Sequence, residues 1–226
     1  MRQVQQIMGM PISIDILNCK DESVFEQVFT RFHKIDRQFS TYRPDSEVSR
    51  YVKGEIKESS LSKELKFVIK ACRLAEKMTN GYFSAWASGR FDPSGYVKGW
   101  AIKQAGQAIE KQRCNTYCIS AGGDILASSD TDKAWSLGIQ DPKNSYKILN
   151  KLSISNGAAA TSGNYERGNH IINPKTSKPA DGFSSVTVTG PDIITADILA
   201  TAIFAMGAGG ETLLQNHRAY RAIMIN

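Results

Sequence analysis

The chain has 226 residues, of which 41% are hydrophobic and 22% are charged. These proportions are typical of a globular protein and argue against long disordered stretches. No window approaches the roughly 18 consecutive apolar residues that a membrane-spanning helix needs, so we expect no membrane span.

The formal net charge is +6, which raises the question of nucleic-acid binding. Lysines and arginines are spread along the chain. Their densest run, Lys63 to Lys77, falls at helical spacing opposite apolar residues, which is typical of a solvated helix face. We therefore expect no nucleic-acid partner, although a basic protein suits an anionic substrate such as a dinucleotide.

The cysteines and the N-terminus bear on the cellular compartment. Cys114 and Cys118 are too far apart for a CxxC redox or zinc motif. Residues 1–15 lack the apolar core and cleavage site of a signal peptide, and no lipidation cysteine lies near the start. We expect a cytoplasmic protein in which all four cysteines, including Cys19 and Cys72, are reduced structural thiols.

The first half of the chain is predicted to be mainly helical. Apolar residues recur there at three- and four-residue steps, which indicates amphipathic helices. The predicted elements are a strand over 10–16, helices over 21–39, 62–78 and 92–112, and a polar loop over 40–50. Asp92 is the expected N-cap of the third helix, with Pro93 at its first position.

The second half is predicted to contain short strands separated by turns. The expected strands cover 116–120, 125–128, 135–140, 148–154, 157–160, 184–189 and 222–225, and a helix covers 195–206. Helices packed on mostly antiparallel strands favour the α+β class. We expect one domain over residues 1–226.

Two segments have backbone features that suit an anionic ligand. In Asp92-Pro93-Ser94-Gly95-Tyr96-Val97-Lys98-Gly99-Trp100, a helix start offers free N–H groups to a phosphate, and Lys98 lies one turn in. The alternative is a capped helix with an exposed lysine. In Gly122-Gly123-Asp124, the glycines permit positive φ and close approach of the backbone to a ligand. The alternative is a plain hairpin turn.

A third segment, residues 161–174, gathers hydroxyls, an acid, a base and His170, which suggests a site. The alternative is a polar loop whose Glu166 and Arg167 satisfy the local backbone. In the fourth, Asp197 and Thr201 share one face of an apolar helix, where Mg²⁺ would compensate the charge. Alternatively, Asp197 stabilises the helix start and Thr201 bonds back to a carbonyl.

These four segments follow a known family pattern together with three further motifs. The further motifs are Met8-Gly9-Met10-Pro11, Ser40-Thr41-Tyr42-Arg43-Pro44-Asp45-Ser46-Glu47 and Asn80-Gly81-Tyr82-Phe83. In this order they resemble the FAD:protein FMN transferases, the ApbE-like family, from about residue 7 to 207. Ser84 replaces the family's usual aspartate, and the short connection to Asp92 is similar to a compact subset of that family.

The resemblance implies an ApbE-like fold and an enzyme that moves the FMN half of FAD onto a Thr or Ser hydroxyl of an acceptor protein, releasing AMP. It implies Mg²⁺ held by Asp197, Thr201 and the Gly95 carbonyl, and His170 as the proton acceptor near the reacting phosphate. The implied FAD-binding residues are Met8, Tyr42, Tyr82, Phe83, Ser84, Asp92, Lys98, Gly122, Gly123, Asp124, Ser162 and His170. FAD hydrolysis to FMN and AMP, or flavin binding without turnover because of Ser84, are the alternatives.

Overall fold

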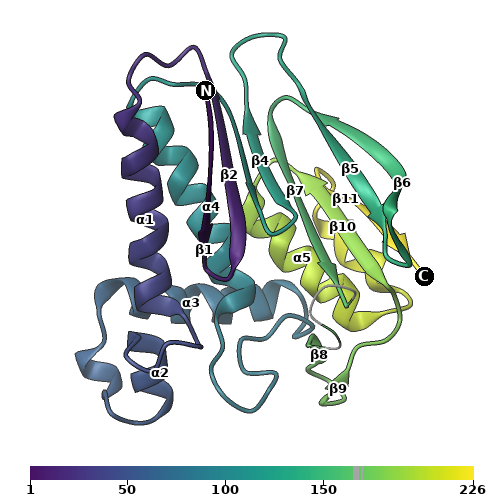
Figure 1. The fold of residues 1–226 in the computed structure, drawn as a ribbon. Coiled ribbons are helices and arrows are strands. Elements are labelled where there is room, and N and C mark those ends of the chain that lie inside the picture. Colours follow the sequence, from purple (N-terminus) through teal and green to yellow (C-terminus); the bar gives the residue numbers. More distant parts are fainter. Residues whose placement is uncertain (165–167, 169) are drawn as a thin grey trace.

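A seven-stranded antiparallel sheet forms the centre of the computed structural model, which describes residues 1–164, 168 and 170–226 (Figure 1). Its strand order is β1-β2-β3-β4-β7-β10-β11, so the N-terminal and C-terminal strands lie at opposite edges. The strands of this sheet are β1 (Arg2–Ile7), β2 (Met10–Leu17), β3 (Thr116–Ala121), β4 (Asp124–Ser128), β7 (Gly157–Gly163), β10 (Ser185–Gly190) and β11 (Arg221–Ile225). Two separate hairpins are β5 (Trp135–Asp141) with β6 (Asn144–Ile154) and β8 (Ile172–Asn173) with β9 (Lys178–Pro179).

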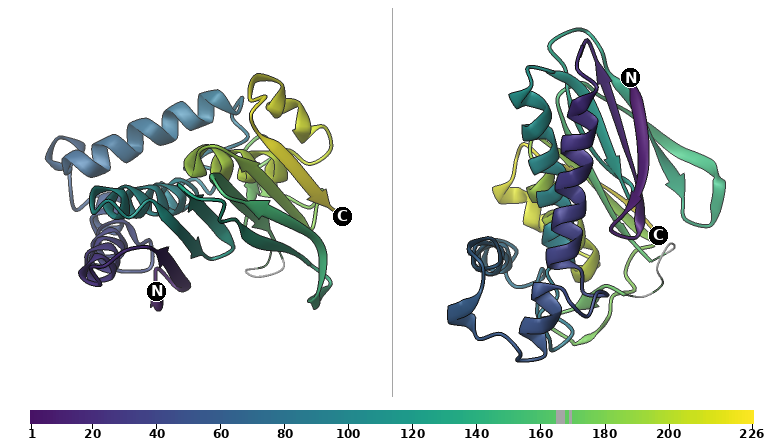
Figure 2. Two further views of the ribbon diagram at one scale, coloured as in Figure 1. Left: turned by 90° about the horizontal axis from the view of Figure 1, so that it is seen from above. Right: turned by 60° about the vertical axis from the view of Figure 1, so that its left-hand side comes forward.

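The helices gather on one side of this sheet, and α3 lies outermost, beyond α4 (Figure 2). They are α1 (Ser23–Phe39), α2 (Glu47–Val52), α3 (Lys63–Met78), α4 (Ser94–Lys111) and α5 (Ile193–Met206), with 3₁₀ turns η1 (Glu58–Ser60) and η2 (Gly210–Asn216). No helix in the described part of the chain is long and apolar enough to cross a membrane.

The core forms where these helices meet the sheet. On β2, Ile12, Ile14 and Ile16 are fully buried at alternate positions, and Phe25 and Phe32 of α1 belong to the same apolar cluster. Alternation in a strand and three- or four-residue spacing in a helix place apolar side chains on one face. The same periodicities predicted these elements, and the expected α+β class is confirmed.

Two expectations about the first half of the chain are wrong in detail. Residues 47–52 form α2, which begins inside the predicted loop 40–50 and runs two residues beyond it, because Ser46 caps this short helix and its Oγ accepts a hydrogen bond from the Ser49 N–H at 3.0 Å. The third helix begins at Ser94, one residue later than expected, and Pro93 occupies the N-cap position. Asp92 lies just before it, and its Oδ1 accepts a hydrogen bond from the Ser94 N–H.

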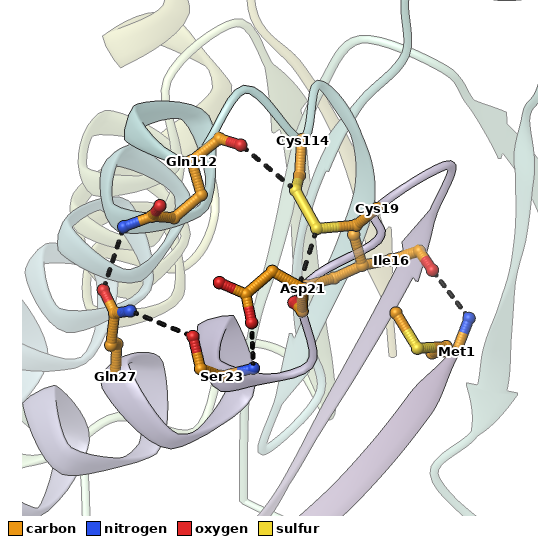
Figure 3. Close-up of a disulfide and its surroundings, with 8 residues drawn as sticks. All are labelled: Met1, Ile16, Cys19, Asp21, Ser23, Gln27, Gln112 and Cys114. Atoms are coloured by element: carbon orange, nitrogen blue, oxygen red, sulfur yellow. Dashed lines mark hydrogen bonds between the residues drawn. A yellow bond between two sulfur atoms is a disulfide. The ribbon is translucent and has the colours of Figure 1, made fainter.

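The expectation of four reduced thiols is also wrong, because Cys19 and Cys114 form a disulfide (Figure 3). The fold brings the loop after β2 next to the end of α4, and the two Cα atoms lie 5.3 Å apart. Cys72 and Cys118 are free and buried, and burial raises the pKa of each thiol to about 12. Burial therefore keeps these two thiols protonated and unreactive.

Loss of the disulfide is expected to destabilise the fold. It links residues 95 positions apart, so it restricts the unfolded chain strongly. We expect Cys19→Ala/Cys114→Ala to lower the free energy of unfolding by about 2–4 kcal/mol. Urea unfolding of the wild type with and without a reductant is the matched measurement. A wild-type chain that is equally stable in both conditions would contradict the prediction.

Candidate functional site

A cleft of about 790 Å³ opens where several turns and helix ends meet. This volume lies within the range of small-molecule and cofactor pockets. Its wall is built from segments that are far apart in the sequence: the β1–β2 turn, the end of α1, the start of α4, the β3–β4 turn, the end of β7 and the middle of α5. The fold therefore brings all four chemically rich segments to one place.

Two tight turns bring backbone to the edge of the cleft. Met8 and Gly9, between β1 and β2, have φ values of 57° and 73°, and Gly122 and Gly123 have 54° and 86°. Two-residue turns with positive φ join antiparallel strands without splaying them. A Cβ on Gly122 would lie 2.7 Å from the Met10 sulfur. The Gly122-Gly123 segment is thus a hairpin turn that also lines the cleft.

Close packing of α4 against α5 sets the position of Asp197. A Cβ on Gly99 would lie only 3.2 Å from the Ile193 carbonyl oxygen and 3.3 Å from the Asp197 Cβ. Because Gly99 has no side chain, the two helices approach closely. The Gly99 N–H donates a hydrogen bond to the Asp197 Oδ2 at 3.1 Å.

A buried charge cluster lies beside this contact. The Lys98 Nζ is 2.9 Å from the Asp124 Oδ2 and 3.4 Å from the Asp197 Oδ1. The other Asp124 oxygen accepts a hydrogen bond from the Thr161 N–H at 3.1 Å. Asp124 is 0% exposed and Asp197 is 2% exposed. One ammonium, 22% exposed at the edge of the cleft, therefore faces two buried carboxylates.

The pKa values report the electrostatic balance of this cluster. Burial raises the pKa of Asp197 to about 7, an effect that Lys98 opposes and the Asp124 charge reinforces. Burial lowers the pKa of Lys98, but the two carboxylates outweigh it, and the net direction is upward. An excess of negative charge in a buried site is stabilised by an added cation.

Thr201 lies one turn after Asp197 on α5, and both line the cleft. The Thr201 Oγ1 is 3.1 Å from the Ser162 Oγ on β7. The start of α5 is capped by Asp192, whose Oδ1 accepts from the Thr195 N–H at 3.0 Å. The start of α5 is therefore already capped by Asp192. Asp197 lies in the second turn, so stabilisation of the helix start does not explain why this carboxylate is buried there.

The donor atoms available here fit a hard cation. Asp197, Thr201 and Gly95 all line the cleft, and they offer a carboxylate, a hydroxyl and a backbone carbonyl. Mg²⁺ prefers oxygen ligands and is commonly held by one or two carboxylates. No group of three His, Cys, Asp or Glu side chains is arranged for a metal among the described residues. A soft-metal site is thus not supported by the part of the chain that the structure covers.

A family model described as the ApbE family matches residues 8–88 and 85–224, which is nearly the whole chain. The chain belongs to the ApbE family. Two curated relatives are named FAD:protein FMN transferase. The *Haemophilus influenzae* protein is 30% identical over 129 residues, covering 51% of this chain and 37% of the relative, and the *Vibrio cholerae* protein is 33% identical over 129 residues, covering 51% and 38%. The matched region thus spans less than half of these relatives.

Solved structures show that the ApbE fold extends over the full chain. The ApbE protein from *Thermotoga maritima* has a TM-score of 0.85 at 21% identity, covering 99% of this chain and 93% of that one. The flavin transferase ApbE from *Vibrio cholerae* has a TM-score of 0.85 at 20% identity, covering 99% and 92%.

Most of the residues that the sequence predicts for an ApbE site line the cleft. They are Met8, Tyr42, Ser84, Asp92, Gly95, Lys98, Gly122, Gly123, Ser162, His170, Asp197 and Thr201. Three predicted FAD-binding residues do not line it. Asp124 is buried and paired with Lys98. Phe83 packs against Gly95, where an added Cβ would lie 3.2 Å from the Phe83 ring. Tyr82 faces Lys175, whose Nζ is 5.7 Å from the ring centroid.

His170 faces the cleft from the segment between β7 and β8. Its Nδ1 is 2.9 Å from the Gly168 carbonyl oxygen. This contact favours the tautomer in which Nδ1 carries the proton and Nε2 is free to accept one. Glu166 and Arg167, which the sequence analysis placed in the same segment, lie outside the described residues, as do Tyr165 and Asn169.

Several polar residues of the ApbE cleft are absent from the set of site residues predicted from the sequence; they are Asp36, Ser40, Thr41, Ser88, Ser94 and Thr161. Asp36 lies on the last turn of α1, and Thr41 lies in the loop that follows. Thr41 is inside a motif that the sequence analysis matched, next to Tyr42, so its position in that motif was an available signal. Asp36 lies one turn before the buried Phe39. No sequence motif marks Asp36, and only the position of the end of α1 in the fold shows that it borders the cleft.

Proposed function

We propose that this chain is an FAD:protein FMN transferase that uses Mg²⁺ to move the FMN part of FAD onto a Thr or Ser hydroxyl of an acceptor protein. The observation that carries the proposal is the buried Lys98, Asp124 and Asp197 cluster beside Thr201 in the cleft. The names of the curated relatives support the same reaction.

The start of α4 is the part of the cleft that suits the pyrophosphate of FAD. Ser94 and Gly95 line the cleft there. The Ser94 N–H is bonded to the Asp92 Oδ1, and the Tyr96 and Val97 N–H groups are bonded to the Pro93 carbonyl oxygen. This helix start therefore offers an anion the Gly95 N–H and the positive end of the helix dipole. Gly9 and Gly123 also line the cleft, and a Cβ on either would meet nothing within 4 Å, so a ligand can approach the backbone there.

In this proposal Asp197, Thr201 and the Gly95 carbonyl would hold the metal. Mg²⁺ bound there would neutralise charge on the pyrophosphate as AMP leaves. Lys98 and the Gly99 N–H hold the Asp197 carboxylate in place from the protein side. Positioning and charge stabilisation dominate phosphoryl-type transfer, so a fixed carboxylate is the feature that the reaction needs.

The remaining step is proton transfer. The acceptor hydroxyl oxygen forms a bond to the FMN phosphorus, and the bond from that phosphorus to the bridging oxygen breaks, so the electrons leave with AMP. We assign the hydroxyl proton to the His170 Nε2, because the Nδ1 side of the ring is engaged with the Gly168 carbonyl. A histidine is suited to accept a proton near neutral pH.

His170→Asn is expected to lower the transfer rate by about 100-fold or more while changing the FAD dissociation constant little. A proton acceptor contributes to turnover, whereas a binding contact contributes mainly to affinity. Single-turnover rates at saturating FAD, compared with fluorescence titration of FAD, separate the two roles. His217→Asn, on a histidine outside the cleft, is the matched control. If FAD affinity collapses and the rate survives, His170 is a binding residue.

One incubation distinguishes the three candidate activities. The chain is mixed with FAD and Mg²⁺, with or without a candidate acceptor protein encoded beside it, and AMP release and covalent flavin fluorescence are measured. If AMP is released only when the acceptor is present, and the acceptor becomes fluorescent in the same sample, the chain is a transferase. AMP without an acceptor indicates FAD hydrolysis to FMN, and no AMP in either case indicates a flavin-binding protein without turnover, in which Ser84 replaces the usual aspartate.

Two sequence-based expectations about context stay predictions. The absence of a nucleic-acid partner is one of them. The other is the cytoplasmic location, and the Cys19–Cys114 disulfide weighs against it, because disulfides persist mainly in oxidising compartments.

A further inference from the structure

The outer face of α3 has a composition that the proposed reaction does not use. Its exposed residues at helical spacing are Lys63, Lys66, Phe67, Lys70, Arg73, Leu74 and Lys77. None of them lines the cleft. Five cations therefore share one helix face with two large apolar side chains.

The two apolar side chains distinguish this face from an ordinary solvated one. Phe67 is 51% exposed and Leu74 is 57% exposed, although both are large. They are seven positions apart, so they lie two turns from each other on the same side of the helix, with Lys70 between them. The opposite side, with Leu65, Val68, Ile69 and Cys72, supplies the contacts to the core.

The position of α3 makes this face accessible to a flat partner. Figure 2 shows α3 on the outside of the molecule, with its long side free and α4 between it and the sheet. A protruding helix can lie along an extended surface over its whole length. A groove, by contrast, would be needed to hold a peptide. The second cleft of the described structure reaches only Ser62 and Glu64 at the start of α3, and none of the seven residues of this face lines it.

We infer that the outer face of α3 binds the surface of an anionic lipid bilayer. Lysines and Arg73 would contact the phosphate headgroups, while Phe67 and Leu74 would enter the boundary between headgroups and acyl chains. Basic amphipathic helices with aromatic and leucine residues among the cations bind membrane surfaces in this way. The carboxylates of α3 are Glu64, which is exposed, and Glu76, which is half-buried, so the five cations leave the helix with a net positive charge.

The surroundings of the face are compatible with this contact. The Phe67 ring lies 6.2 Å from the Trp100 ring, so part of Phe67 remains anchored in the protein. The Arg73 guanidinium lies 4.9 Å from the centroid of the Trp86 ring, which holds it close to the surface. The exposed remainder of each side chain is then available to lipid without any change in the fold.

Vesicle sedimentation tests the inference independently of catalysis. The wild type is expected to sediment with phosphatidylcholine vesicles that contain about 30% phosphatidylglycerol, and not with phosphatidylcholine alone. Each lysine near an anionic surface contributes about fivefold to binding, so Lys63→Glu/Lys70→Glu should reduce the partition coefficient by about 20-fold or more. Both side chains are exposed, and a glutamate at position 63 suits the start of a helix.

The control variant is Lys143→Glu/Lys151→Glu on the β5–β6 hairpin. It makes the same change in net charge at exposed positions on the side of the molecule away from α3 (Figures 1 and 2). Retained sedimentation in this variant supports the inference. Equal loss of sedimentation in both double variants would show that binding depends only on the total charge of the chain, and this result would overturn the inference.

A probe of insertion completes the test. Leu74→Cys carrying a polarity-sensitive thiol label should shift its emission to shorter wavelength on anionic vesicles, and Tyr146→Cys on β6 should not. The free cysteines Cys72 and Cys118 are buried and should leave the labelling selective. No shift at position 74 overturns the inference. So does a chain that binds soluble polyglutamate but neither type of vesicle, because its partner is then an acidic polypeptide.

Discussion

Asp197→Ala is expected to abolish Mg²⁺-dependent release of AMP from FAD while the chain stays folded. Asp197 is the charged member of the proposed ligand set, and its carboxylate is fixed by Lys98 and by the Gly99 N–H. Loss of that ligand should cost several kcal/mol of transition-state stabilisation, a fall in rate of about 1,000-fold or more. The fold should survive because Lys98 keeps Asp124 as its partner.

Two measurements make this prediction specific. AMP release is followed over a range of Mg²⁺ concentrations, and Mg²⁺ protection against thermal unfolding is followed in the same samples, since a ligand that binds only the folded state stabilises it. The variant should lose both responses. Asp181→Asn, at an exposed position outside the cleft, serves as the control and should keep both. Wild-type turnover of Asp197→Ala at saturating Mg²⁺ would remove Asp197 from the ligand set.

Local elements of this fold could be predicted where burial repeats with a clear period. The alternation of Ile12, Ile14 and Ile16 predicted β2, and the spacing of Val24, Phe25, Val28 and Phe29 predicted α1. β1 could not be predicted in this way, because five of its six residues are exposed and no apolar alternation marks it. The six residues of α2 are likewise too few for a helical period to appear.

Contacts between distant segments could not be predicted from local patterns. The sequence marks Cys19 and Cys114 only as two cysteines, and their pairing depends on how the sheet places the ends of β2 and α4. The ordered motifs did predict which residues gather at the cleft. The motifs did not predict that the Lys98 ammonium lies between the Asp124 and Asp197 carboxylates. Asp124 is 26 positions and Asp197 is 99 positions after Lys98, and no periodicity encodes contacts at such separations.

That unpredicted contact makes Lys98→Met the substitution with the largest expected effect on stability. Removal of the ammonium leaves Asp124 and Asp197 close together, both buried, with no cation between them. Breaking a buried ion pair by removing one partner costs about 3–5 kcal/mol. The aliphatic part of methionine keeps the packing of the lysine stem, so the loss should reflect charge and not a cavity.

Lys103 offers a matched control on the same helix. Its ammonium pairs with Asp192, but the two side chains are 42% and 28% exposed. An exposed pair contributes about 0–1 kcal/mol, so Lys103→Met should change the free energy of unfolding much less than Lys98→Met. Urea unfolding of the two variants in metal-free buffer compares them directly.

A second substitution separates charge from packing at Lys98. Lys98→Met/Asp124→Asn removes one carboxylate along with the ammonium, so the double variant should be more stable than Lys98→Met alone. Added Mg²⁺ should also stabilise Lys98→Met, because a divalent cation can offset the charge of both carboxylates. If Lys98→Met unfolds at the same urea concentration as Lys103→Met and does not respond to Mg²⁺, the cluster does not carry the net negative charge on which the metal assignment rests.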